Sequence, residues 1–289
     1  MSTVTHPTQP TVTRTSFVPT GSGLSFTGLL RSESIKLWSL RSTYWSFGLV
    51  IVAAIGIAVL MAFSMSATVG FDPATGAAMG VDDAQILVLV ATTGLSLGQL
   101  IVAVLGVLSI SGEYSSGMIK STLSAVPNRL PALWAKVCVL FAFTFLVGLV
   151  SVLGSFLIAT PILGTEDISV SLFDNDVLLP LLGNVLFLAF IAVFAIGIGT
   201  ILRSSAGGIA TVLGITMLLP VVLGILSSFV DWIGDILPFL FTMAGSTMAN
   251  ANTANFPDLM EPWQALLVVL AWLFVSLGTA ALLLKRRDA

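Results

Sequence analysis

Few ionisable side chains of this 289-residue chain are placed where they could do chemistry. His6 is the only histidine and Cys138 the only cysteine, so no imidazole or thiolate cluster can form within one chain. Neither an HExxH metal motif nor a GxxxxGK[ST] phosphate-binding loop occurs in the sequence. We therefore expect no catalytic residue, no metal site and no cofactor in this chain. We expect Cys138 to be a small core residue.

Acidic residues cluster in the segments that separate the apolar runs, and calcium binding is the chemistry to consider there. One cluster holds Asp72, Asp82 and Asp83, and a second holds Glu166, Asp167, Asp174 and Asp176. A calcium loop places its oxygen ligands at a spacing such as DxDxDG, which neither cluster has. We interpret both clusters as solvated acidic rims.

The composition places the chain in a membrane. It is 56% hydrophobic and 9% charged, with a mean hydropathy of +1.06, a balance that excludes a soluble globular protein. No basic surface is present to attract nucleic acid. The predicted fold class is all-α: a polytopic membrane protein whose partners include membrane lipids.

The charges predict one topology for six membrane spans. The predicted spans are residues 45–64, 86–111, 137–160, 180–202, 207–228 and 263–284. With these spans, all eleven Lys and Arg residues fall on one side and eleven of the fourteen acids on the other. Since Lys and Arg remain cytoplasmic, we expect a multi-pass protein of the cell membrane with both termini in the cytoplasm.

Two segments outside the spans are predicted to have their own structure, after a disordered cytoplasmic tail at residues 1–23. The rest, 24–289, is expected to be a single transmembrane domain. Residues 24–45 have the pattern of an amphipathic helix that lies in the membrane interface. Its apolar face consists of Phe26, Leu30, Leu37, Leu40 and Tyr44. Glu33 lies near that face, where it either reaches the headgroups or pairs with a basic residue of the protein. The external segment 229–262 predicts short helices that dip into or rest on the outer leaflet.

The predicted spans contain no Asp, Glu, Lys, Arg or His, and Gln99 and Asn184 are their most polar side chains. Ion-coupled carriers normally need an ionisable group in the membrane, so this pattern disfavours such a carrier. Small residues at Gly94 and Gly98, and at Gly148, Ser151 and Ser155, indicate close helix packing. That packing is either within the bundle or along a dimer seam.

The segment between the second and third spans, GEYSSGMIKSTLSAVPNRLPALWAK at 112–136, is the strongest functional candidate. Its first half predicts a short helix that Glu113 begins, and Pro127 ends that helix. We expect Glu113 to form an exposed ion pair with Lys120, Arg129 or a partner protein. A helix held at the inner membrane surface would give a soluble partner protein a rigid surface on which to dock. A generic interfacial helix has the same sequence pattern.

This segment resembles the hallmark of type-2 ATP-binding-cassette (ABC) permeases, closest to an actinobacterial-like subfamily. In that family an acidic residue is followed by Gly, an apolar helix, Pro and Arg, and Glu113, Gly117, Leu123, Pro127 and Arg129 stand at those positions. The stretch LRSESIKLWSLRSTYW at 30–45 resembles the subfamily's LxSEWxKLRSLRSTxW, with departures at Ser34 and Trp38. LRSSAGGIA at 202–210 and LLLKRRDA at 282–289 also fit.

The resemblance implies a transport subunit rather than an enzyme. Two permease subunits, identical or closely paralogous, would form a dimer above two copies of a cognate ATPase, which would bind ATP and Mg. The residues implied in coupling to that ATPase are Glu113, Tyr114, Gly117, Lys120, Leu123, Pro127 and Arg129. Arg31, Glu33 and Lys36 would belong to the connecting helix, and the segment before the last span would form the outer gate.

The function expected from these observations is an exporter of a lipid-like, amphipathic or drug-like substrate, powered by the separate ATPase. The alternative is a non-transporting immunity or signalling protein that also partners an ATPase. An ion-coupled carrier or a membrane enzyme is a third class, and transport that survives a dead ATPase would favour the carrier.

Overall fold

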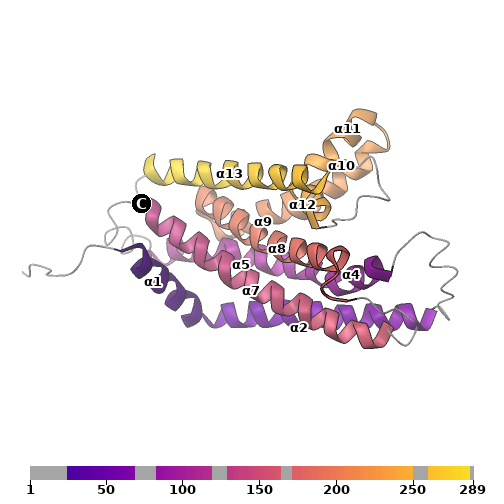
Figure 1. Ribbon diagram of the computed structural model, residues 1–289. Helices are drawn as coiled ribbons and strands as arrows, with labels where there is room; N and C mark the ends of the chain where they lie inside the picture. The colour runs from indigo at the N-terminus through magenta and orange to yellow at the C-terminus, as the bar shows by residue number, and fades with distance from the viewer. Residues whose placement is uncertain (1–24, 69–82, 119–128, 164–170, 250–259, 287–289) are drawn as a thin grey trace, which may run out of the picture.

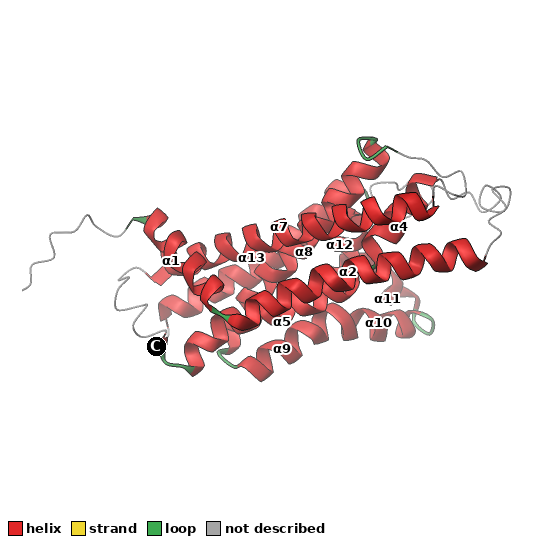
Figure 2. Cartoon of the chain, turned by 90° about the horizontal axis from the view of Figure 1, so that it is seen from below, coloured by secondary structure: helices red, strands yellow, loops and turns green. Residues whose placement is uncertain are grey.

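The structure, a computed structural model, describes residues 25–68, 83–118, 129–163, 171–249 and 260–286. Within these ranges the chain is helical apart from short turns and loops, and it contains no strand (Figure 2). The elements in chain order are α1 (Phe26–Ser39), α2 (Arg41–Thr68), α4 (Asp83–Thr93), α5 (Leu95–Ser115), α7 (Arg129–Leu163), α8 (Asn175–Leu202), α9 (Ser205–Leu213), η2 (Gly214–Leu218), α10 (Leu219–Ser227), α11 (Asp231–Ile236), η3 (Leu237–Phe239), α12 (Phe241–Ala249) and α13 (Pro262–Arg286).

Within the described ranges, six helical stretches are long and apolar enough to cross a membrane, which confirms the expected multi-pass, all-α architecture. They are Arg41–Ser66, Ala84–Ser115, Leu130–Leu163, Asn175–Leu202, Ser205–Ser227 and Pro262–Arg286. Most are longer than the apolar runs, because a charged residue ends a hydrophobic stretch without ending the helix. Glu113 and Lys136 therefore belong to the second and third of these helices.

The fourth span, α8, forms the centre of the bundle. In its most apolar stretch 72% of the residues are buried, and it packs against α5, α7 and α13. α1 and the carboxyl end of α13 lie at one end of the bundle, whereas α4 and α11 lie at the other (Figure 1). We call the first of these the α1 end.

The small residues noted in the sequence pack within the bundle. A Cβ atom at Gly94 would lie 2.5 Å from the Ala54 backbone of α2, so only glycine permits this approach. Gly98 faces Val50, which also belongs to α2, and Gly148 faces Val185 and Leu188 of α8. For these residues the interpretation as packing within one chain is confirmed.

Two expectations about the start of the chain and about the cysteine are wrong. The helix predicted across residues 24–45 is interrupted, because Leu40 is extended (φ −86°, ψ 114°) and separates α1 from α2. Leu40 links the two helices and Tyr44 belongs to α2, so neither residue continues the apolar face of α1. Cys138 is exposed on α7 and is not a core residue.

The segment before the last span forms the short helices α11, η3 and α12, and α12 enters the bundle. Phe241 of α12 stacks on Phe194 of α8 with ring centroids 4.6 Å apart, and it also contacts Phe187 and Trp272. The indole Nε1 of Trp272 donates a hydrogen bond to the Phe239 carbonyl, 3.0 Å away. These contacts attach η3 and α12 to α8 and α13.

Candidate functional site

Three helices each bring charged side chains to one point at the α1 end of the bundle. Glu33 and Lys36 are three residues apart on α1 and therefore lie on the same side of that helix. Glu113 lies in the last turn of α5, and Lys136 lies near the start of α7. We call these four residues the charge cluster.

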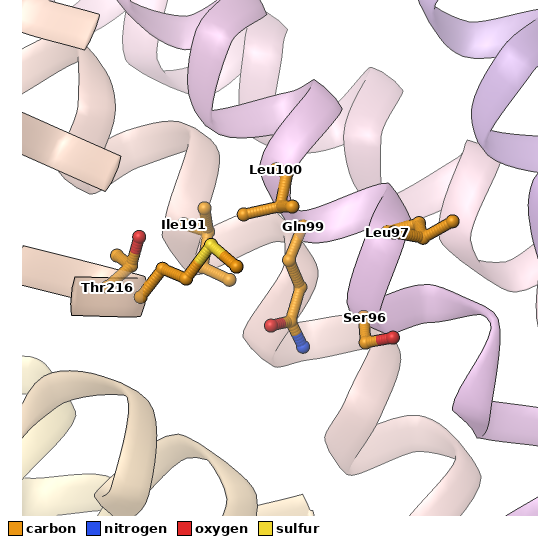
Figure 3. Close-up of a pocket in the computed structure, with 7 residues that line it drawn as sticks. Ser96, Leu97, Gln99, Leu100, Ile191 and Thr216 are labelled. Carbon is orange, nitrogen blue, oxygen red and sulfur yellow. The ribbon is translucent and has the colours of Figure 1, made fainter. Parts of the chain in front are cut away.

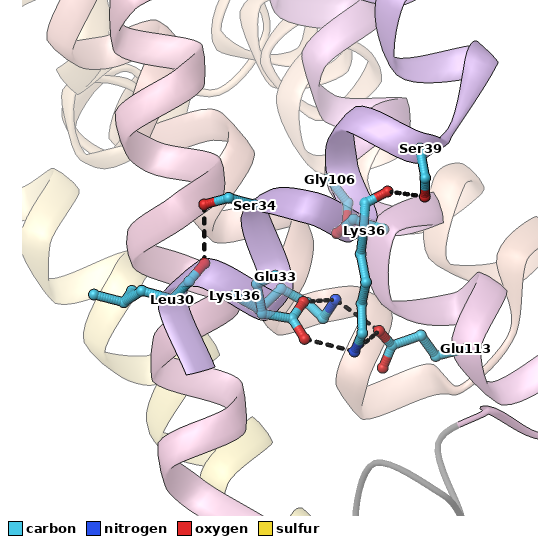
Figure 4. Close-up of polar contacts among 9 residues, drawn as sticks. Leu30, Glu33, Ser34, Lys36, Ser39, Gly106, Glu113 and Lys136 are labelled. Carbon is cyan, nitrogen blue, oxygen red and sulfur yellow. Dashed lines mark hydrogen bonds and ion pairs between the residues drawn. The ribbon is translucent and has the colours of Figure 1, made fainter. Parts of the chain in front are cut away.

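The charge cluster is joined by four short ion pairs (Figure 4). Lys136 Nζ lies 2.6 Å from Glu33 Oε2 and 2.9 Å from Glu113 Oε1. Lys36 Nζ lies 2.6 Å from Glu33 Oε1 and 3.2 Å from the same Glu113 oxygen. Each lysine thus bridges both carboxylates, and two positive charges balance two negative ones.

The cluster is largely withdrawn from water. The side chains of Glu33, Glu113 and Lys136 are 6%, 5% and 10% exposed, and that of Lys36 is 26% exposed. Burial of a charge is costly unless it is paired and hydrogen-bonded. Loss of one member leaves an unbalanced charge in an apolar setting, so the four groups stabilise the helix contacts only as a set.

The electrostatics of the α1 members follow from this pairing. Burial alone would raise the pKa of Glu33, but the charge of Lys136 and the hydrogen bonds from both lysines hold that pKa below its ordinary value. Burial alone would lower the pKa of Lys36, but the two carboxylates raise it above its ordinary value. Both groups are therefore charged at neutral pH.

The same end of α5 has further contacts with its neighbours. The Ser111 and Ser205 hydroxyls are 2.9 Å apart and join α5 to α9. The Arg203 guanidinium, in the turn between α8 and α9, lies 5.1 Å from the centroid of the Tyr114 ring. The last two turns of α5 thus contact α1, α7, α9 and the α8–α9 turn.

Gly117 has a backbone role that explains a glycine at this position. Its φ of +72° is in the left-handed region, which favours glycine. Its N–H donates to the Tyr114 carbonyl at 3.3 Å, which satisfies a carbonyl at the end of α5. Gly117 therefore sets the direction in which the chain leaves α5 toward residues 119–128.

The sequence-predicted residues are only partly brought together. Glu33, Lys36 and Glu113 meet. Tyr114 instead contacts Arg203 in the α8–α9 turn, and Arg31 is exposed and lies outside the cluster. Lys120, Leu123 and Pro127 lie outside the described residues, as does the Arg129 side chain. The helix predicted at 114–126 is described only at its beginning.

The structure corrects the expected environment of Glu113 and adds Lys136 to the site. Glu113 does not begin a separate helix, because α5 continues to Ser115. It does not form an exposed ion pair: the residue is 4% exposed, and its partners are Lys36 and Lys136. Lys136 is not among the residues that the resemblance implies, although a lone Lys next to an apolar run is a signal for a buried partner.

Glu33 pairs with basic residues of the protein, which confirms one of the two interpretations of this carboxylate. Both of its carboxylate oxygens accept hydrogen bonds from lysines at 2.6 Å. This charge-balanced arrangement has no spare base or nucleophile among its four members. The role of the charge cluster is structural. Its ion pairs join α1, α5 and α7, so that displacement of one of these helices would displace the others.

No protein-family model and no curated protein matches this sequence.

Proposed function

We propose that this chain is the transmembrane permease subunit of an ABC transporter, powered by a separate ATPase subunit. The observation that supports the proposal most is the set of contacts around the end of α5. Glu113 and Tyr114 contact α1, α7 and the α8–α9 turn immediately before residues 119–128. A force applied to those residues would therefore reach several spans together.

In this proposal, the helix predicted at 114–126, most of which lies outside the described residues, is the docking element for the ATPase at the cytoplasmic face. Closure of two ATPase subunits on ATP would displace the docking element and the end of α5. The charge cluster would make α1 and α7 follow, because separating buried ion pairs is unfavourable. The helices would then move as rigid bodies and change the exposure of a cargo cavity.

Two features of the sequence and of the described spans support a separate ATPase as the source of energy. The sequence has no GxxxxGK[ST] loop to hold nucleotide phosphates. The charged residues of the described spans lie near helix ends: Glu113 is two residues from the end of its span, and Lys136 is six residues from the start of its own. Coupling to an ion gradient normally uses an ionisable group near mid-depth.

The proposed assembly contains two permease subunits, identical or closely paralogous, and two ATPase subunits. The fifth span leaves room for a neighbour, because only 11% of its most apolar stretch is buried within the chain. Lipid-like or amphipathic cargo suits a cavity with apolar walls. We propose export as the direction.

Co-purification with the cognate ATPase tests the proposal. The two proteins, expressed together, should purify as a complex of two copies of each, and the chain alone should have no ATPase activity. Ser121→Pro should release the ATPase, because proline within a helix costs about 3 kcal/mol and displaces the docking surface. Ser121→Ala is the matched control and should retain the complex. A complex that persists in Ser121→Pro would contradict the assignment of the docking element.

A further inference from the structure

A cavity of about 260 Å³ lies between the second, fourth and fifth spans. It is lined by Ser96, Leu97, Gln99 and Leu100 of α5, Ile191 of α8, and Thr216 and Met217 of η2. Leu97 and Met217 are 46% and 58% exposed and form its rim, whereas Ile191 is 1% exposed and forms its inner wall. A molecule dissolved in the lipid layer can therefore enter from the side.

The polar groups of this cavity lie at mid-depth. Gln99 is fifteen residues from the start and sixteen from the end of its span, Ala84–Ser115. Thr216 is eleven residues from either end of Ser205–Ser227. Water is scarce at that depth, so a polar group there requires a partner within the protein or in a bound molecule.

Gln99 has no such partner in the described part of the chain. Figure 3 shows its side chain extending from α5 into the space between Ser96 and Ile191. Asn184, the other amide noted in the spans, is satisfied differently, because its Nδ2 donates to the Pro180 carbonyl at 2.9 Å. The Gln99 amide can both donate and accept a hydrogen bond, and both capacities face the cavity.

The fifth-span wall of the cavity has an unusual backbone. Gly214–Leu218 form a π-helix, η2, of the kind that often occurs at functional sites. The Thr216 hydroxyl donates to the Val212 carbonyl at 2.8 Å, which leaves its oxygen free to accept. The Thr216 carbonyl accepts a hydrogen bond of 2.7 Å from the Thr242 hydroxyl of α12. This wall of the cavity is thus tied to an outer helix.

We propose that this cavity binds an uncharged amphipathic molecule whose neutral hydrogen-bonding group, such as an amide, ester or hydroxyl, pairs with Gln99. The apolar part of the molecule would lie against Leu100, Ile191 and Met217. Among the residues that the structure describes, no Lys, Arg, Asp or Glu lines the cavity, so a charged headgroup would be buried without a counter-ion. The amide therefore selects for a neutral polar group.

Identification of this molecule as cargo rests on the proposed function, whereas binding does not. A molecule in the cavity would touch Thr216, to which α12 is directly hydrogen-bonded. Occupancy would then be communicated to the outer helices through one carbonyl group. Binding is therefore measured on the full chain in lipid nanodiscs without an ATPase, so that failure to bind and failure to couple are distinct results.

Photoaffinity labelling tests the binding site. The probe is a long-chain fatty amide that carries a diazirine, compared with the fatty acid of the same chain. We expect saturable labelling of residues 96–100 and 214–218 by the amide, competed by unlabelled amide, and little labelling there by the acid. Gln99→Leu should weaken amide binding about tenfold, the effect of one lost hydrogen bond. Asn184→Leu, at an amide already satisfied by Pro180, should leave the affinity within about twofold.

Two results would overturn the inference. One is unsaturable labelling spread along lipid-facing helices such as α2, with amide and acid equivalent. The other is unchanged amide affinity in a folded Gln99→Leu chain. Should that variant fail to fold, saturation and competition in the wild-type chain still decide the outcome.

Discussion

Lys136 Nζ lies 2.6 Å from Glu33 Oε2, which joins the third membrane span to the helix that precedes the first. The two residues are 103 positions apart, and both are buried. Glu113 and Lys36 complete the cluster, so α1, α5 and α7 meet through charges rather than through apolar contacts alone. In the proposed function, this junction would keep α1 in place when the end of α5 moves.

The cluster should be stable only while its charges balance. Lys136→Gln leaves two carboxylates facing one lysine, and we expect a loss of about 3–5 kcal/mol, the usual cost of breaking a buried pair. The double variant Lys136→Gln/Glu33→Gln removes one charge of each sign and should recover part of that loss. Thermal unfolding in detergent measures both changes. Lys285→Gln, at an exposed residue near the end of α13, is the control and should have little effect. Equal destabilisation by the single and double variants would contradict the coupling.

The pKa changes predict a stability that declines at both extremes of pH. The pKa of Glu33 is held below its ordinary value of 4.5, so its contribution is complete above that value and is lost as the pH falls through the depressed pKa. The pKa of Lys36 is raised above 10.5, so its contribution is complete below that value and is lost as the pH rises through the raised pKa.

The unfolding temperature measured across this pH range checks both signs. Glu33→Gln should flatten the acid side of the profile, and Lys36→Gln should flatten the alkaline side. Asp235→Asn, at an exposed position on α11, should change neither. An acid side that is equally steep with and without Glu33 would show that other groups govern it.

Coupling to the ATPase can be separated from stability by a balanced substitution. Glu113→Gln/Lys36→Gln removes a pair 3.2 Å apart and leaves the Glu33–Lys136 pair at 2.6 Å intact. We expect this variant to fold and to bind the ATPase, but to lose several-fold in the stimulation of ATP hydrolysis by cargo, because α5 is no longer bonded to α1. Stimulation equal to the wild type would assign the cluster to stability alone.

Much of the fold follows from local patterns in the sequence, and the charge cluster does not. Runs of apolar residues about 20 long predict membrane helices whatever their neighbours are. The pairing of Glu33 with Lys136 depends on how α1 packs against α7, which hydropathy does not encode. The predicted ends of the second and third spans differ from the observed helix ends for a related reason. Glu113 and Lys136 interrupt the apolar runs, yet they continue helices because each has a buried partner.

The middle of the fifth span shows a second limit to prediction from the sequence. Its hydropathy predicts one span but not the π-helix Gly214–Leu218, which is defined by its backbone hydrogen bonds. The Thr216 carbonyl in this π-helix accepts a hydrogen bond from the Thr242 hydroxyl of α12. Likewise, the position of Phe241 between α8 and α13 follows from aromatic contacts with Phe194 and Trp272. Such contacts join distant segments, so no local pattern identifies them.

The orientation of the bundle is tested by cysteine labelling in a Cys138→Ser background, which is needed because Cys138 is exposed. Cysteines at Gly76, Asn175 or Asn252 should react with an impermeant thiol reagent added to intact cells. Cysteines at Ser116 or Ser204, at the α1 end, should react only after the membrane is opened, because the positive-inside rule places that end in the cytoplasm. Labelling of Ser116→Cys from outside intact cells would contradict the predicted six-span topology.

ATP-driven movement of a fluorescent neutral lipid analogue in proteoliposomes tests the central claim most directly. The vesicles contain this chain and its cognate ATPase, with an inactive ATPase variant as the control. We expect movement of the analogue only with ATP and the active ATPase, and none with either protein alone. A chain that binds the ATPase but moves no analogue would favour the immunity or signalling alternative. Movement that continues with the inactive ATPase, or a chain that binds no ATPase, would contradict the proposed function.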